Sequence, residues 1–112
     1  MLSCTDEATV ALITVKNNTG TVQPDVLVYE FEYAPYHEYG SNPNYANTQK
    51  LTDKQGVAQF DLQGYEFEEG KQEATLYFTV FTSNINSTDV IGTVLVLCKK
   101  GETVSAEIIV NE

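Results

Sequence analysis

The chain has 112 residues, and its six lysines and 16 acidic residues give a net charge of −10, with no arginine. This length suits a single domain. An acidic chain without arginine lacks the cations that neutralise nucleic-acid phosphates or anionic lipid headgroups, which argues against both kinds of binding. The hydrophobic fraction of 42% is sufficient for a packed core. No apolar run approaches the roughly 20 residues of a membrane-spanning helix.

Hydrophobic and polar residues alternate along most of the chain, whereas the period of a helix is almost absent. Clusters of asparagine, glycine, proline and acidic residues interrupt the alternation, as turns and loops do. The pattern predicts strands at 8–16, 24–33, 48–52, 57–62, 73–83, 90–98 and 103–110. A long loop is expected over 34–47, and an acidic loop before the fifth strand carries Glu66, Glu68 and Glu69.

The alternation also assigns a core face to most of these strands. The side chains expected in the core are Ala11, Ile13, Val15, Ala58, Phe60, Leu62, Leu76, Phe78, Val80, Val104, Ala106, Ile108 and Val110. In the second strand Leu27, Tyr29, Phe31 and Tyr33 alternate with Val28, Glu30 and Glu32. This predicts one solvated face, which carries the glutamates. The sixth strand is apolar on both faces.

Short strands separated by turns predict an all-β fold, a seven-stranded antiparallel Greek-key β-sandwich. In this interpretation residues 8–112 form a single sandwich domain, and residues 1–7 are an N-terminal tail. No linker, repeat or low-complexity tract divides the chain.

Three segments carry a family resemblance: Val15–Gly20 with the following 26–31, Leu51–Phe60, and Gly101–Val104. Together they resemble the carboxypeptidase regulatory-like domain, whose T-D-x-x-G-x-a-x-F segment is similar to the second of them. In that segment Asp53 can bond the backbone two residues on, Gly56 supplies the φ of the turn, and Phe60 enters the core. The resemblance implies a transthyretin-like (prealbumin-like) sandwich, with an immunoglobulin-like one as the alternative. It also implies an accessory module without catalytic residues of its own.

The N-terminal residues carry a second resemblance. Met1-Leu2-Ser3-Cys4 resembles the end of a bacterial lipobox, in which a small residue precedes a lipidated cysteine. Thr5-Asp6-Glu7 is similar to the acidic export signal of surface lipoproteins in the Bacteroides group. The resemblance implies lipidation of Cys4 and an outer-membrane-anchored or surface-exposed protein of the cell envelope. Such a protein would touch the membrane only through its lipid anchor.

Cys4 and Cys98 lack the close spacing of a redox motif or a zinc knuckle. Either they form a disulfide, or Cys4 carries lipid while Cys98 is a small buried hydrophobe, and we favour the second interpretation. His37 is the only histidine, so a two-histidine metal site or relay is excluded. It could act as a general base, but a loop histidine facing water is the commoner case. We therefore expect that the protein is not an enzyme.

No metal or other cofactor is expected. The acidic residues at 66–69 and at 30–32 could hold calcium, but neither group forms an EF-hand or a D-x-D-x-D ladder. We interpret them as solvated faces that keep the protein soluble. A Lys–Asn isopeptide bond would need Lys16 near Asn111 with a glutamate between them, and no motif supports it.

The long loop is rich in tyrosine, a residue that offers stacking area together with a polar tip. Tyr36, His37, Tyr39 and Tyr45 are therefore predicted to form a recognition loop. The alternative is that these rings fold back and cap one end of the sandwich.

A second candidate surface lies on the later strands. Tyr77 and Phe81 share the outward face of the fifth strand if Phe78 and Val80 point inward. With Ile91 and Leu95 from the sixth strand, they predict an apolar face for a partner. Coverage of this face by loops of the protein itself is the alternative.

The sequence thus predicts a non-enzymatic, extracytoplasmic binding or accessory module of a cell-envelope lipoprotein. Its expected partners are a protein or a carbohydrate at the cell surface, and no nucleic acid. The alternative is a structural or assembly module that pairs with a partner chain through the apolar strand 90–98.

Overall fold

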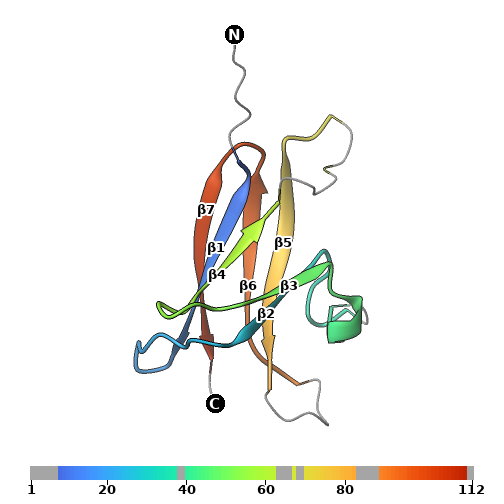
Figure 1. The fold of residues 1–112 in the computed structure, drawn as a ribbon. Coiled ribbons are helices and arrows are strands. Elements are labelled where there is room, and N and C mark those ends of the chain that lie inside the picture. Colours follow the sequence, from blue (N-terminus) through green and yellow to red (C-terminus); the bar gives the residue numbers. More distant parts are fainter. Residues whose placement is uncertain (1–7, 38–39, 63–66, 68–69, 83–88, 111–112) are drawn as a thin grey trace.

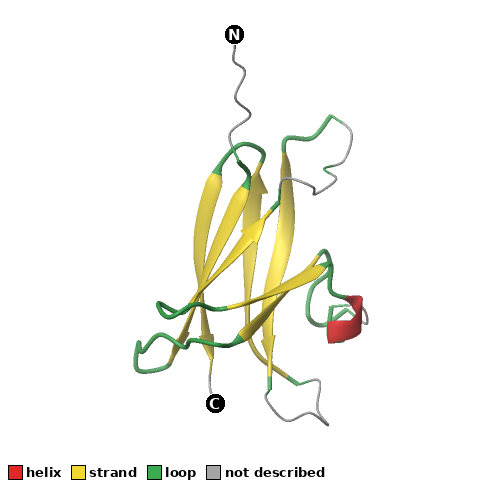
Figure 2. Cartoon of the chain, in the orientation of Figure 1, coloured by secondary structure: helices red, strands yellow, loops and turns green. Residues whose placement is uncertain are grey.

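The structure is a computed structural model that describes residues 8–37, 40–62, 67, 70–82 and 89–110. Within these residues the chain forms strands, connecting turns and one short 3-10 turn, Pro43–Tyr45 (Figures 1 and 2). None of the described residues lies in a helix that is long and apolar enough to span a bilayer.

The strands form two sheets that pack face to face (Figure 1). The three-stranded sheet has the order β4-β1-β7, and the four-stranded sheet has the order β3-β2-β5-β6. The strands are β1 (Val10–Asn17), β2 (Leu27–Phe31), β3 (Thr48–Leu51), β4 (Val57–Asp61), β5 (Glu73–Phe81), β6 (Val90–Lys99) and β7 (Thr103–Val110). This confirms the all-β sandwich and places a strand within each of the predicted ranges, give or take a residue at the ends.

One strand pair departs from the expected antiparallel arrangement. β1 pairs with β4 in antiparallel fashion but with β7 in parallel, over Val10–Asn17 and Thr103–Val110. The chain leaves β1 for the four-stranded sheet and returns through the β6–β7 turn, so that β7 runs in the same direction as β1 when it reaches the free edge of β1 (Figure 1). Alternation within a strand is the same for parallel and antiparallel partners, so it carries no signal for this pairing.

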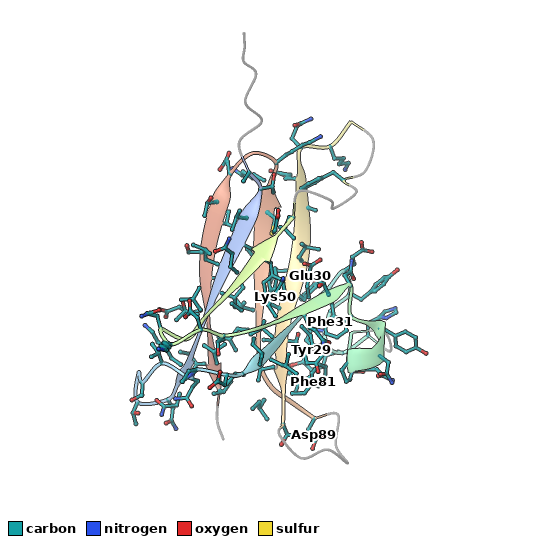
Figure 3. The ribbon with its side chains drawn as sticks, viewed as in Figure 1. Tyr29, Glu30, Phe31, Lys50, Phe81 and Asp89 are labelled. Carbon is teal, nitrogen blue, oxygen red and sulfur yellow. The ribbon has the colours of Figure 1, made fainter. Side chains whose placement is uncertain are left out.

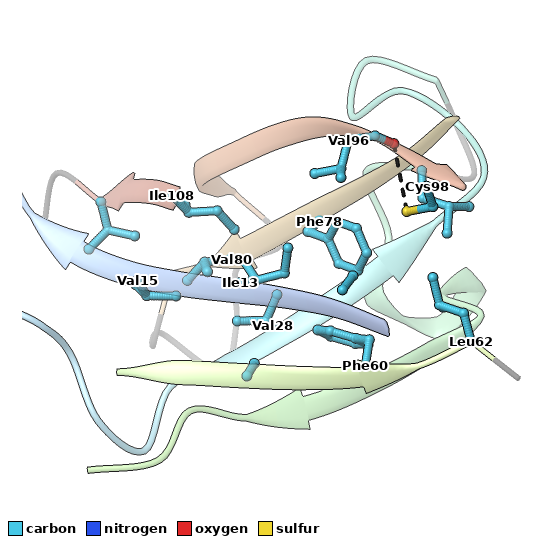
Figure 4. Packing of buried hydrophobic residues seen from close by; sticks show 14 residues of the cluster. Ile13, Val15, Val28, Phe60, Leu62, Phe78, Val80, Val96, Cys98 and Ile108 are labelled. Carbon is cyan, nitrogen blue, oxygen red and sulfur yellow. Dashed lines mark hydrogen bonds between the residues drawn. The ribbon is translucent and has the colours of Figure 1, made fainter. Parts of the chain in front are cut away.

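The core lies between the two sheets (Figure 4). It contains the predicted inward residues of β1, β4 and β5, Ile108 and Val110 of β7, and also Val28 of β2 and Val96 and Cys98 of β6. Ile13, Phe60 and Phe78 are fully buried, and the rings of Phe60 and Phe78 lie 4.8 Å apart between their centroids. Full burial of side chains of this size stabilises a fold by about 1.5–3 kcal/mol each. The alternating burial of β1 and β4 follows directly from the pleat of a strand that has one face against the core.

The orientation of β2 is the opposite of the one predicted from the sequence. Val28 and Glu30 point into the core and are buried, whereas Leu27 is exposed and Tyr29 is half-buried. The register explains this orientation, because Glu30 lies opposite Phe78 of β5, and residues that face each other across two strands share a face. Since Phe78 belongs to the core, Glu30 does too. The face of β2 that was expected to meet water therefore meets the core.

The turn between β3 and β4 forms as its residues predict. The Asp53 carboxylate accepts a hydrogen bond from the Gln55 amide at 2.9 Å, and Gly56 adopts a φ of +77°. A Cβ at Gly56 would lie 2.8 Å from the Cβ of Val22, so both the conformation and the space require glycine here. The turn fixes where β4 begins, and hence which of its residues enter the core.

Candidate binding surface

The side of the four-stranded sheet that faces away from the core carries four exposed leucines; we call it the outer face. Strand register places Leu95 opposite Tyr77 and Leu27 opposite Leu51 on this face, with Leu97 two residues beyond Leu95. Leu95 and Leu51 are each 58% exposed, Leu97 is 46% exposed and Leu27 is 38% exposed. Single exposed leucines are common on soluble proteins, but several on one sheet face mark a candidate interface.

An aromatic cluster packs on the same outer face where β2 lies beside β5 (Figure 3). The Phe81 ring makes edge-on contacts with Tyr29, at 5.3 Å between ring centroids, and with Phe31, at 6.0 Å. Phe31 and Thr79 point to the outer face and are nevertheless fully buried, so the protein's own chain covers this part of the face. Edge-to-face pairs hold rings in fixed orientations. The cluster is therefore ordered and is only partly accessible from solvent.

The predicted partner-face residues do not all come together. Tyr77 and Leu95 lie opposite each other on the outer face, and Phe81 lies in the aromatic cluster. Ile91, in contrast, is half-buried and packs against the core. The cause is a bulge between Val80 and Phe81, which leaves Ile91 without a partner residue in the ladder and shifts the register.

The 34–47 loop is folded back on itself. The Ala34 carbonyl accepts a hydrogen bond from the His37 amide, and the His37 carbonyl accepts hydrogen bonds from the Gly40 and Ser41 amides. A Cβ on Gly40 would collide with the Ala34 carbonyl oxygen, so the backbone approaches itself closely here. At the other end of the loop the Asn47 amide donates to the Glu30 carbonyl at 2.8 Å. These bonds give the loop a defined shape.

The loop presents some of its predicted recognition residues to solvent. Tyr36 is 98% exposed and Tyr45 is 51% exposed. His37 is also exposed, and its ring stacks on Tyr33 at 4.8 Å between centroids. Tyr39 lies outside the described residues. The described rings of this set are therefore exposed to solvent and are not buried against the sandwich.

Glu30 is the most unusual residue of the structure, and the sequence analysis expected it in solvent. Its side chain is 2% exposed, and its Oε1 has no hydrogen-bond partner among the described residues. Burial, and secondarily the charge of Glu32, raises the pKa of the Glu30 carboxyl from 4.5 to about 7. The sequence signal for burial of this face of β2 was Val28, an apolar residue that shares the face with Glu30.

Cys98 is buried in the core, as expected for a small hydrophobe. Burial, together with the charge of Glu30, raises the pKa of the Cys98 thiol from 9.0 to about 11. A thiol is nucleophilic as its thiolate, so this one is poorly suited to covalent catalysis. Cys4, the predicted lipidation site, lies outside the described residues.

The charged side chains do not assemble a metal site in the part of the chain that the structure describes. Glu66, Glu68 and Glu69 lie outside that part. Glu32 is exposed and accepts a hydrogen bond from the Asn47 side chain at 3.2 Å. Lys16 forms an exposed ion pair with Glu107 at 2.7 Å, and Asn111 is not among the described residues.

A groove of about 510 Å³ opens on the outer face beside the start of β5. Its lining residues are Glu32 and Tyr33 beyond the end of β2, Lys71 before β5, Glu73, Ala74 and Thr75 in β5, and Leu97 in β6. Most of these side chains are exposed. The groove thus combines carboxylates, an aromatic ring and an apolar floor at the edge of the outer face.

The fold and these surfaces define an all-β, two-sheet sandwich domain with exposed leucines on its outer face. No protein-family model matches the chain, and no curated protein matches it either. Among solved structures it is similar to the Bacillus anthracis TIE protein, with 11% identity, a TM-score of 0.50, and coverage of 93% of this chain. This likeness supports the sandwich fold alone.

The fold is also similar to chlorocatechol 1,2-dioxygenase from Pseudomonas putida, with 12% identity, a TM-score of 0.47 and coverage of 98% of this chain. The chain spans 17% of the length of the TIE protein and 63% of the length of the dioxygenase. At such identity neither likeness assigns an activity.

Proposed function

We propose that this chain is a non-enzymatic binding module of the cell envelope, which binds a partner protein through the outer face. The observation that carries the proposal is the set of four exposed leucines on one side of one sheet, around an ordered and partly covered aromatic cluster. Apolar side chains around an ordered aromatic centre are what a protein interface needs at its core. The resemblances to accessory carboxypeptidase regulatory-like modules and to lipoprotein N-termini support the placement in the envelope.

The potentially catalytic side chains support a module without enzymatic activity. The Cys98 thiol is buried and has a raised pKa, and Glu30 is enclosed in the core. His37 is exposed on a loop, and its ring stacks on Tyr33. A catalytic base must lie within hydrogen-bond reach of the proton that it removes.

The alternative is a structural or assembly module that pairs with a further protein chain through the apolar strand β6. The observation that favours it is the position of Leu95 and Leu97, which lie exposed on β6 at the edge of the four-stranded sheet. Self-association that depends on protein concentration, and that is lost on changing these leucines, would support this alternative.

The proposed function is tested by pull-down from an envelope extract of the source cells. The bait is the wild-type chain or the double variant Leu95→Ser/Leu97→Ser, and the control is Ile109→Ser on the other sheet. Ile109 is 46% exposed, as Leu97 is, so the control changes one apolar side chain of the same exposure on the other sheet. We expect a partner that wild type and control retain and that the double variant loses. Equal retention by all three baits, or capture of no partner, would refute the proposal.

The placement in the envelope has its own test, which is the intact mass of the protein extracted from its source cells. We expect a diacylglycerol thioether on Cys4 and loss of Met1–Ser3. An unmodified chain that begins at Met1 would refute the anchored envelope protein, and the pull-down would still test binding.

A further inference from the structure

The edge of the outer face contains a gap in the strand ladder. β5 has nine residues and pairs with β6 along its whole length. β2 pairs with β5 only through Tyr29–Phe31, opposite Tyr77–Thr79. Within the described part of the chain, Glu73–Leu76 therefore has β6 as its only strand neighbour. In a β-ladder alternate residues direct their N–H and C=O groups to opposite sides, so part of this backbone points away from β6.

The gap exists because the chain leaves the sheet after Phe31. If β2 continued in its register, Tyr33 would lie opposite Thr75. Instead, Tyr33 stacks on His37 of the long loop, and the end of that loop is bonded back to the Glu30 carbonyl. The groove of about 510 Å³ occupies the place that a continued β2 would fill. It is bounded by the departing chain on one side and by the start of β5 on the other.

The side chains around the gap select the chemistry of an occupant. Glu32 and Glu73 are exposed on its two sides, and Lys71 is the single cation among the lining residues. Tyr33 and Leu97 also line the groove and add an aromatic ring and an apolar side chain to it. On a chain with a net charge of −10, these groups favour a positively charged partner.

From these observations we infer that the gap beside Glu73–Leu76 binds an extended, basic segment of a partner protein as an added strand. Main-chain hydrogen bonds to β5 hold the segment, as in strand addition to other sheet edges. Lysine or arginine side chains of the segment meet Glu32 and Glu73 at the groove, and the alternate apolar side chains point to the opposite face of the sheet, on the side of Ala74. This inference rests on the proposed partner-binding function, and it names the place and the chemistry of the contact.

The test uses three synthetic peptides and the full chain, followed by NMR. The first peptide alternates lysine and valine over eight residues, the second alternates glutamate and valine, and the third has the first composition with a central proline. Proline removes a main-chain donor and disrupts an added strand without changing the charge pattern. We expect the first peptide to shift the amide signals of residues 73–76 and to slow their hydrogen exchange severalfold. The other two peptides should bind at least about tenfold more weakly.

Paired variants assign the charge contribution to the gap. Glu32→Gln/Glu73→Gln should weaken binding of the lysine–valine peptide by roughly tenfold, because two charge-assisted contacts are lost. The matched control, Glu102→Gln/Glu107→Gln, removes the same charge from exposed positions elsewhere and should change affinity by less than about twofold. Equal weakening by both variants would overturn the inference, as would equal binding of the proline peptide or amide shifts centred on other strands.

The outcomes also separate this inference from the proposed function. If the pull-down partner is lost with Leu95→Ser/Leu97→Ser but is retained by Glu32→Gln/Glu73→Gln, the outer face binds a partner and the gap does not. Loss of the partner with both variants supports binding that extends from the outer face into the gap. Retention of the partner by both double variants refutes the proposed function. Whether the gap binds a basic strand is then decided by the peptide experiment alone.

Discussion

The buried carboxyl of Glu30 makes the folded state sensitive to pH. The pKa of this carboxyl is about 7 in the folded chain, whereas its ordinary value is 4.5. Between these two pH values the folded state keeps a proton that the unfolded state has released. Stability therefore falls as pH rises through this window. Below pH 4.5 the carboxyl is neutral in both states, and the full contribution of this proton to the free energy of unfolding is present. Above pH 7 the carboxyl is charged in both states, and that contribution is lost. At about 1.4 kcal/mol per pH unit, the difference amounts to about 3 kcal/mol.

The substitution Glu30→Gln isolates this effect, because glutamine has nearly the same shape and does not titrate. We expect the free energy of unfolding of the variant, relative to wild type, to rise by about 3 kcal/mol between pH 4 and pH 8. Urea denaturation at four or five pH values measures both proteins. Taking the difference removes the contribution of the other carboxylates, which titrate in both.

The matched control is Glu32→Gln, which removes an exposed charge two residues away. Because the charge of Glu32 contributes to the raised pKa of Glu30, the control should move the transition to slightly lower pH and keep most of its size. A difference between Glu30→Gln and wild type that stays within about 0.5 kcal/mol across this range would contradict burial of a titrating carboxyl.

Three further predictions concern the core and its supporting contacts. Phe60→Ala should lower the free energy of unfolding by about 3–5 kcal/mol, because it leaves a cavity beside Phe78; a loss below 1 kcal/mol in urea denaturation would contradict the packing. Thr52→Val should cost about 1–3 kcal/mol by the same assay, since the buried Thr52 hydroxyl donates to the Gln23 carbonyl at 2.6 Å and the isosteric variant leaves that carbonyl without this donor. Alkylation of Cys98 by iodoacetamide at pH 8 should be at least about a hundredfold slower in the native chain than in urea, and comparable rates would refute its burial.

The sequence was most informative where a strand has one clearly apolar face. Ile13 and Phe60 were expected in the core and are fully buried there, because alternation in β1 and β4 leaves one choice of face. In the β3–β4 turn, Asp53 and Gly56 carry signals that depend on local geometry alone, and the turn forms as they predict.

The orientation of β2 could not be derived from its own residues. Both of its faces carry apolar side chains, Val28 on one and Phe31 on the other, and both are buried. The face that Glu30 shares is decided by pairing with Phe78 of β5, a contact between residues distant in the sequence. The buried carboxyl was missed for this reason.

The candidate surfaces were also predicted only in part from the sequence. Tyr77 and Leu95 were predicted from alternation, and the register places them opposite each other. The bulge at Val80, which turns Ile91 toward the core, has no residue signature that periodicity can detect. The gap beside Glu73–Leu76 depends on the residue at which β2 leaves the sheet, and element ends are what alternation defines least.

The parallel ladder between β1 and β7 has a mechanical consequence. The chain enters β1 at one end of the sandwich and leaves β7 at the opposite end (Figure 1). A force that pulls these two ends apart acts along both strands in opposite directions and so loads their ladder in shear. All the bonds between Val10–Asn17 and Thr103–Val110 then share the load, instead of opening one at a time as in a hairpin that is peeled from its end. Under tension the domain should behave as a stiff element whose rupture requires the two neighbouring strands to slide past each other together.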